Sequence, residues 1–217
     1  MLLYSQDERR FFFTIKAGAS FGGSQPGSYN DNGQANLMID ATGGVGVSYF
    51  FSDDWQVCLD LCYVRKGVNC PVESTTEVNE FYQSKSPLEE IRTPDVYAWF
   101  NNGYIEIPLT LGYTWGYDIC RTRIGGYVSR RISTKTDILV EGLNFHGSEI
   151  DKTKEIYKEH LANYDAGIKI ANEFYLDKLS VGLEFSAGFI PVIKSKWRID
   201  NSQNSTMAVC IYLGYTF

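Results

Sequence analysis

Apolar and polar residues alternate along eight stretches of the chain, each about nine to twelve residues long. The last stretch shows this most clearly, because every second residue from Met207 to Phe217 is large and apolar. Successive side chains of a β-strand point to opposite faces, so the alternation predicts strands with one apolar and one polar face. The predicted strands lie at about residues 11–21, 41–51, 55–66, 104–113, 119–130, 161–171, 179–189 and 206–217.

The lengths of these strands and of their connections indicate a barrel that crosses a membrane. Strands of soluble sheets have about five or six residues, whereas about 9–11 residues cross a bilayer at a tilt of about 45°. The predicted connections are short at about 52–54, 114–118 and 172–178, and long at about 22–40, 67–103, 131–160 and 190–204. This arrangement predicts an all-β fold, an eight-stranded antiparallel up-and-down transmembrane β-barrel with short periplasmic turns and long extracellular loops.

A proline interrupts one of the predicted strands. Pro108 lies inside the strand at 104–113. Because proline has no N–H to donate to a strand ladder, we expect a bulge or a local break at this position.

The polar faces carry charges of both signs, at Lys16, Asp60, Lys66, Glu106, Arg121, Arg123, Lys169 and Glu184. The lumen of an eight-stranded barrel is just wide enough for side chains, and opposite charges can fill it as hydrogen-bonded pairs. Neighbouring predicted strands bring Asp60 and Glu106 near the two arginines. We therefore expect a polar network inside the barrel, without an open pore, formed by Asp60, Glu106, Arg121, Arg123, Lys169 and Glu184.

Aromatic side chains gather near the ends of the apolar faces, where a bilayer has its polar interfaces. The expected membrane-interface aromatics are Phe21, Tyr49, Phe51, Trp55, Tyr63, Tyr113, Trp115 and Phe217. Lysine and arginine are scarce on the apolar faces, although a water-exposed surface would need them for solubility. The alternative is a soluble lipocalin-like barrel whose apolar face points inward.

Composition and charge exclude several other classes. The chain has 217 residues, a formal net charge of −6 and no run of about 20 apolar residues, so a general nucleic-acid binder and a transmembrane helix are both disfavoured. The five cysteines lack zinc-site spacing, and His146 and His160 have no partner at a useful distance in sequence. We therefore expect no catalytic site, metal or cofactor. Residues 1–10 lack the pattern of a signal peptide, and we expect such a segment to have been cleaved or omitted.

Several segments resemble a known family. The last strand, Val209–Phe217, resembles the C-terminal signature of bacterial outer-membrane barrels, which ends in a phenylalanine. The segment Tyr104–Tyr113 (YIEIPLTLGY) resembles the YxEIPL strand of the Bacteroidota outer-membrane β-barrel family, which is porin-family and PorT-like or OmpX-like. The hairpin Gly46–Trp55 and the segment Leu61–Gly67 are similar to the second and third strands of that family. The resemblance implies an outer-membrane location and no shared catalytic site.

Together, these observations predict a single outer-membrane barrel domain over residues 1–217. We expect a monomeric, non-enzymatic envelope protein that lies in the lipid bilayer and binds no nucleic acid. Its role would be structural, or it would bind a protein or surface ligand through the extracellular loops. The alternatives are an accessory component of secretion or envelope biogenesis, which the PorT resemblance implies, a lipid-modifying enzyme and a soluble lipid carrier.

Overall fold

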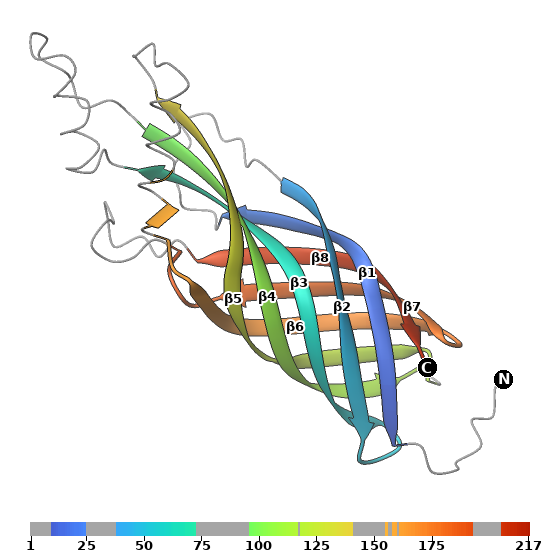
Figure 1. The fold of residues 1–217 in the computed structure, drawn as a ribbon. Coiled ribbons are helices and arrows are strands. Elements are labelled where there is room, and N and C mark those ends of the chain that lie inside the picture. Colours follow the sequence, from blue (N-terminus) through green and yellow to red (C-terminus); the bar gives the residue numbers. More distant parts are fainter. Residues whose placement is uncertain are drawn as a thin grey trace, which may run out of the picture.

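Eight antiparallel strands form one closed barrel, in which each strand pairs with its neighbours in sequence and β8 pairs back with β1. The computed structural model describes residues 10–24, 38–72, 96–116, 118–140, 155, 158–159, 161–192 and 205–217. The strands are β1 (Phe11–Ser24), β2 (Met38–Phe50), β3 (Trp55–Val72), β4 (Val96–Trp115), β5 (Cys120–Val140), β6 (Tyr164–Leu176), β7 (Leu179–Gly188) and β8 (Thr206–Thr216). The predicted closed, eight-stranded antiparallel barrel is confirmed (Figure 1).

The apolar face of each strand points outward and the polar face points into the lumen. Leu109 and Leu213 are 58% and 65% exposed on the outer wall, whereas Glu106, on the same strand as Leu109, has no exposed surface. The inward positions of β7 follow the same rule, since Ser180, Glu184 and Ser186 are all buried. The fold thus exposes an apolar wall and buries its charges. Within the described ranges, no helix is long and apolar enough to cross a membrane.

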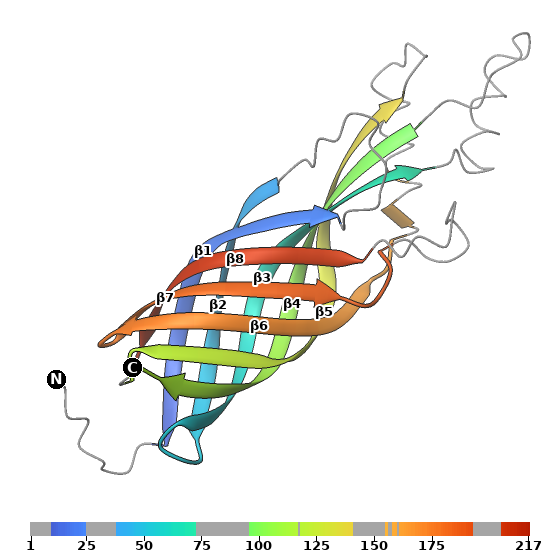
Figure 2. The same cartoon turned by 180° about the vertical axis from the view of Figure 1, so that it is seen from behind.

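Short turns join the strands at one end of the barrel, where β1 begins and β8 ends (Figure 2). Aspartate occupies the left-handed backbone region in two of these turns, at Asp118 (φ 65°) and Asp177 (φ 59°). Aspartate tolerates this region better than most residues because its short polar side chain can bond to nearby backbone. The turn between β6 and β7 is tighter than the predicted 172–178, because β6 continues to Leu176 and β7 starts at Leu179.

Three adjacent strands extend beyond the rest of the barrel. β3, β4 and β5 have 18, 20 and 21 residues, whereas the other five have 10 to 14. Figure 1 shows them projecting together beyond the barrel at the end opposite the turns. We call residues 64–72, 96–103 and 132–140 the projecting sheet.

The projecting sheet corrects the sequence-based boundaries, which assigned 67–103 and 131–160 to loops, ended the third strand at 66, began the fourth at 104 and ended the fifth at 130. A β-bulge explains part of the error: Gly103 pairs with Ser133, but Tyr104 pairs with Arg131, so one residue of β5 is extra. Such an insertion breaks the two-residue period from which the strands were predicted. A sheet outside the bilayer also has no need for a continuous apolar face.

Pro108 interrupts the ladder between β3 and β4 without changing the register of the two strands. β3 and β4 pair at Leu59 with Leu109 and again at Cys62 with Glu106, and Asp60 and Leu61 between them have no ladder partner on β4. The register is the same on both sides of the gap. The expected local break therefore occurs here, while the bulge in β4 and β5 lies at Gly103 and Tyr104.

Close packing inside the barrel requires a residue without a side chain at position 182, which is Gly182. A Cβ atom built on Gly182 would collide with the ring of Tyr212, whereas one on the outward-facing Gly126 would meet only the Gly167 carbonyl oxygen, at 3.5 Å. The lumen has no spare volume at Gly182, whereas the outer wall has open space at Gly126.

We predict that Gly182→Val lowers the free energy of unfolding by about 1–3 kcal/mol, because it overpacks the lumen beneath Tyr212. Gly126→Val is the matched control and should leave stability unchanged or raise it, since valine favours an exposed strand position. Urea unfolding in phospholipid micelles measures both. Equal unfolding midpoints for the two variants would contradict the packing argument.

Candidate functional site

Lys169 and Lys66 tie three carboxylates together in the half of the lumen nearer the projecting sheet. Lys169 Nζ lies 2.6 Å from Glu184 Oε1 and also forms an ion pair with Glu106. Lys66 Nζ lies 2.7 Å from Glu106 Oε2 and 3.1 Å from Asp165 Oδ2. All five side chains are almost completely buried. Glu106 is therefore shared between two lysines.

Arg123 and Lys16 hold two carboxylates in the half of the lumen nearer the turns. Arg123 Nη1 lies 2.8 Å from Asp60 Oδ2, and Arg123 Nη2 lies 2.8 Å from Glu173 Oε1. Lys16 Nζ lies 2.9 Å from Asp60 Oδ2 and 3.5 Å from Glu173 Oε1. Arg121 adds a longer pair to Glu173, at 3.7 Å. Glu173 also accepts a 2.5 Å hydrogen bond from the Tyr212 hydroxyl.

The two halves form one continuous, neutral chain of ion pairs, which we call the lumen network. Arg123 joins them through Glu184, at 3.8 Å, so the chain runs from Arg121 to Asp165. Among the described residues it contains five cations and five carboxylates, at Lys16, Lys66, Arg121, Arg123, Lys169, Asp60, Glu106, Asp165, Glu173 and Glu184. Buried charges are tolerated best when each is paired, and every charge of the lumen network has a partner of opposite sign.

The structure places all six residues of the expected polar network in the barrel interior, but one pairing was predicted wrongly. Glu106 pairs with lysines, and not with Arg121 or Arg123. The register explains this: Arg123 lies opposite Gly112 of β4. Six residues of a strand separate Gly112 from Glu106, which is about 20 Å at about 3.3 Å per residue.

Sequence reasoning missed Glu173, which contacts three cations of the lumen network. The predicted strand ended at residue 171, so Glu173 was assigned to a turn. The signal was present, because Lys169, Ala171 and Glu173 continue the inward alternation of β6. Asp165, at the other end of β6, also has more partners than its sequence context indicated: it accepts hydrogen bonds from Tyr127 and Thr206 as well as from Lys66.

Side chains and backbone close the described lumen. The cavity beside Cys62 and Cys210 has a volume of about 10 Å³, close to the minimum that holds one water molecule. Towards the projecting sheet, Phe100 and Tyr104 are completely buried. There β1 and β3 approach so closely that a Cβ atom on Gly22 would collide with backbone of β3. These side chains and the backbone leave little open volume at these levels of the described lumen.

The expected interface aromatics lie on the outer wall. Trp55 stacks on Tyr113 with ring centroids 4.9 Å apart, Tyr49 lies against Phe11 at 4.8 Å, and Phe217 lies against Tyr215 at 4.9 Å. Phe51 and Trp115 are also exposed near the turns, and the Trp115 indole donates to Thr122. Near the opposite end of the wall, the Tyr63 hydroxyl accepts from Arg65 and Phe21 pairs with Ile39 and Val209.

The described residues offer no metal centre: no group of three His, Cys, Asp or Glu side chains among them lies where it could hold an ion. His146 and His160 lie outside the described residues. Cys58, Cys62, Cys120 and Cys210 carry free thiols, and the first, second and fourth are buried. The side chain of Cys70 is outside the described set.

The projecting sheet has two edges without a strand partner in the described ranges. β2 pairs with β3 only as far as Tyr63, opposite Gly43, so β3 from Val64 onward is hydrogen-bonded only to β4. On the other side, β6 pairs with β5 only up to Arg130, opposite Tyr164. The Arg131 amide donates to the Asn163 carbonyl, and the ladder ends there. Residues 64–72 and 132–140 therefore form strand edges that no described strand pairs with, and we call them the free edges.

A closed barrel with an apolar outer wall and a filled, charged lumen defines an integral outer-membrane β-barrel. The sequence matches the model of the family described as outer membrane protein beta-barrel domain over residues 4–194, and the chain belongs to that family. It therefore lies in the bacterial outer membrane.

Solved structures of outer-membrane proteins resemble this chain at low sequence identity. No curated protein matches the chain. Solved structures that resemble it include Ail of Yersinia pestis in complex with the heparin analogue sucrose octasulfate, with 10% identity over 96% of this chain and 100% of that one and a TM-score of 0.45. Neisserial surface protein A has 8% identity over 96% of each chain and a TM-score of 0.42. Outer membrane protein W of E. coli has 12% identity over 94% and 97%, with a TM-score of 0.36.

We predict that Glu106→Ala lowers the free energy of unfolding by about 3 kcal/mol, because it removes the carboxylate that Lys66 and Lys169 share inside the barrel. Each lysine retains a second carboxylate, which keeps the loss at the lower end of the usual range. Asp53→Ala, in an exposed turn, is the control and should change stability by less than about 0.5 kcal/mol. Urea titration followed by tryptophan fluorescence in micelles measures both. An unchanged midpoint for Glu106→Ala would show that the lumen network does not stabilise the barrel.

Proposed function

We propose that this chain is a non-enzymatic, monomeric interaction protein of the outer membrane, and that it docks a partner protein on the free edges of its projecting sheet. The filled lumen supports a role at the ends of the barrel instead of transport through it. The observation that carries the proposal is the pair of free strand edges at residues 64–72 and 132–140.

A free edge presents a row of unpaired backbone donors and acceptors, to which an extended peptide can add as a further strand. The edge of β5 is well suited to this, because the segment Ile132–Val140 (ISTKTDILV) is rich in β-branched residues and contains no proline or glycine. The edge of β3 is less suited, since Pro71 lacks a donor near its end. We therefore place the main docking edge on β5.

The sequence next to the projecting sheet favours a basic partner. Residues 73–95, which connect β3 to β4, contain six acidic residues and two basic ones, at Glu73, Glu77, Glu80, Glu89, Glu90, Asp95, Lys85 and Arg92. Complementary charge raises the rate of encounter and selects partners more than it adds affinity. The proposed partner is thus an extended segment with basic residues nearby.

The test uses a photo-crosslinking amino acid placed at Lys135, on the docking edge, and at Leu183, on the outer wall of β7, in cells that naturally make the protein. We expect a discrete protein adduct from position 135 and none from position 183, which faces lipid. Adducts that are the same at both positions, or absent at position 135, would contradict docking at this edge.

Two proline variants decide whether an adduct depends on strand addition. Consecutive N–H groups of a strand point to opposite sides, so Ser133→Pro and Thr134→Pro each remove a donor on a different side of β5. The variant that loses only the free-edge donor should keep the barrel folded, shown by its unchanged mobility on an unboiled gel, and should lose the adduct. An adduct that persists in both folded variants would exclude strand addition.

A further inference from the structure

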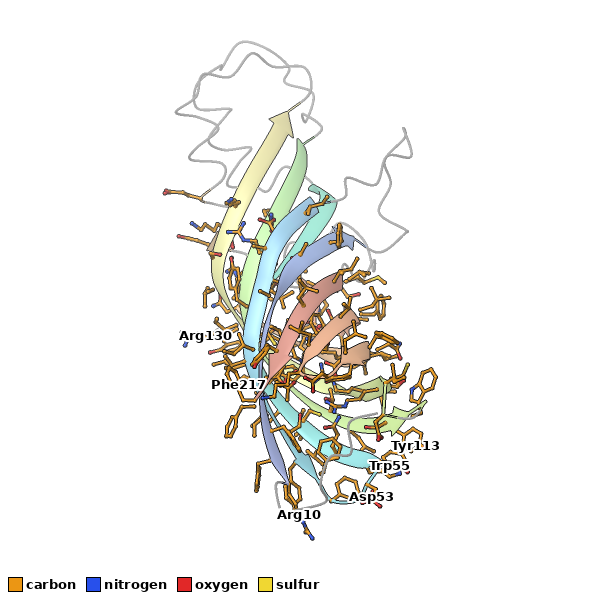
Figure 3. All side chains as sticks on the ribbon, turned by 90° about the vertical axis from the view of Figure 1, so that its right-hand side faces the viewer. Arg10, Asp53, Trp55, Tyr113, Arg130 and Phe217 are labelled. Carbon is orange, nitrogen blue, oxygen red and sulfur yellow. The ribbon has the colours of Figure 1, made fainter. Side chains whose placement is uncertain are left out.

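Arg130 is an exposed cation on a wall that is mainly apolar. On the outward faces of the strands whose side chains are described, the exposed charged residues are Arg130 and Lys135, both basic and both on β5. Within the described part of the chain, no carboxylate forms an ion pair with Arg130. Figure 3 shows Arg130 pointing away from the barrel. An exposed arginine without an ion-pair partner on an apolar wall can bind an anion from outside the chain.

The position of Arg130 along β5 places it at the outer border of the apolar band. Ten residues separate it from Cys120, where β5 leaves the turn. At about 3.3 Å per residue and a tilt of about 45°, this corresponds to a height of about 23 Å, close to the roughly 25 Å band of an outer-membrane barrel. Arg130 therefore lies level with the lipid headgroups of the outer leaflet.

The surroundings of Arg130 match an amphiphile. Tyr164 lies directly opposite it on β6 and is 61% exposed. Towards the turn end of the same two strands, the wall presents the apolar side chains of Val128, Ile124 and Ile168, all exposed. A molecule with an anionic head and apolar chains could thus place its head on Arg130 and Tyr164 and its chains on the wall below them.

The charge of the barrel surface differs between its two ends. The exposed charges of the turns are mainly acidic, at Asp53, Asp54, Asp118 and Asp177, with Lys178 as a basic exception. Arg10, just before β1 at that end, already donates to the Tyr49 hydroxyl, at 3.4 Å. Arg130, which has no ion-pair partner among the described residues, lies towards the other end of the wall, which faces the outer leaflet.

We propose that Arg130 and Tyr164 bind a phosphate group of a phosphorylated glycolipid in the outer leaflet, with its acyl chains lying on Ile124, Val128 and Ile168. A guanidinium suits this role because its planar set of donors can form two parallel bonds to phosphate oxygens, and the tyrosine hydroxyl can donate a third. The site is on the barrel wall and is separate from the free edges of the projecting sheet.

The test measures lipid binding to the full chain, refolded in a maltoside detergent, by native mass spectrometry. The probe is bis-phosphorylated lipid A, and the comparison lipids are its dephosphorylated form and phosphatidylglycerol. We expect Arg130→Gln to weaken lipid A binding about tenfold, the effect of losing one charge-assisted contact of about 1.4 kcal/mol. Arg10→Gln, an exposed arginine at the opposite end, should bind as the wild type does.

The role of the phosphate is tested by a conservative variant and by the comparison lipids. Arg130→Lys should recover part of the affinity, and dephosphorylated lipid should bind the wild type about as weakly as lipid A binds Arg130→Gln. An unchanged affinity for Arg130→Gln, or an equal loss in Arg10→Gln, would overturn the site. Phosphatidylglycerol binding as tightly as lipid A, with the same dependence on Arg130, would overturn its assignment to a glycolipid. Unboiled gels establish that every variant tested is a folded barrel.

Discussion

Every backbone N–H and C=O group inside a bilayer must find its hydrogen-bond partner within the protein, because hydrocarbon offers none. In this chain the requirement is met by closing the sheet, with β8 paired to β1 along the lengths of both strands. Closure with eight strands leaves a lumen only as wide as the side chains that fill it. The local gap in the β3–β4 ladder at Pro108 keeps the register on both sides and leaves the closure intact.

The charge balance of the lumen follows from that closure. A buried, unpaired charge is costly, so cations and carboxylates on the inward positions have to match in number and in place. Lys169 shows how this is done: it pairs with Glu184 on the neighbouring β7 and with Glu106 on β4, which is separated from β6 by β5. The resulting lumen network links strands that share no ladder, and it fills the interior with paired charges.

Much of the barrel could be predicted from the sequence, because alternation reports directly on an apolar outer face. The prediction of strand boundaries failed in the projecting sheet, where no apolar outer face is required. Residues 96–103 and 132–140 lack strict alternation of apolar and polar residues. The bulge at Gly103 and Tyr104 also shifts the register between β4 and β5. The partners of Glu106 depend on the register between strands, and the role of Glu173 depends on where β6 ends. The pattern of apolar and polar residues within one strand gives neither. The free edges of the projecting sheet likewise appear only once the ladders are known.

The central claim is that the lumen is closed by its own side chains, so that the protein acts at its ends and on its wall. Single-channel recording tests this most directly, with the refolded full chain inserted in a planar lipid bilayer under an applied voltage. The structure predicts insertion without stepwise currents of nanosiemens size. Steady openings of that size, reproducible in independent refolding preparations and absent from detergent alone, would contradict a filled lumen.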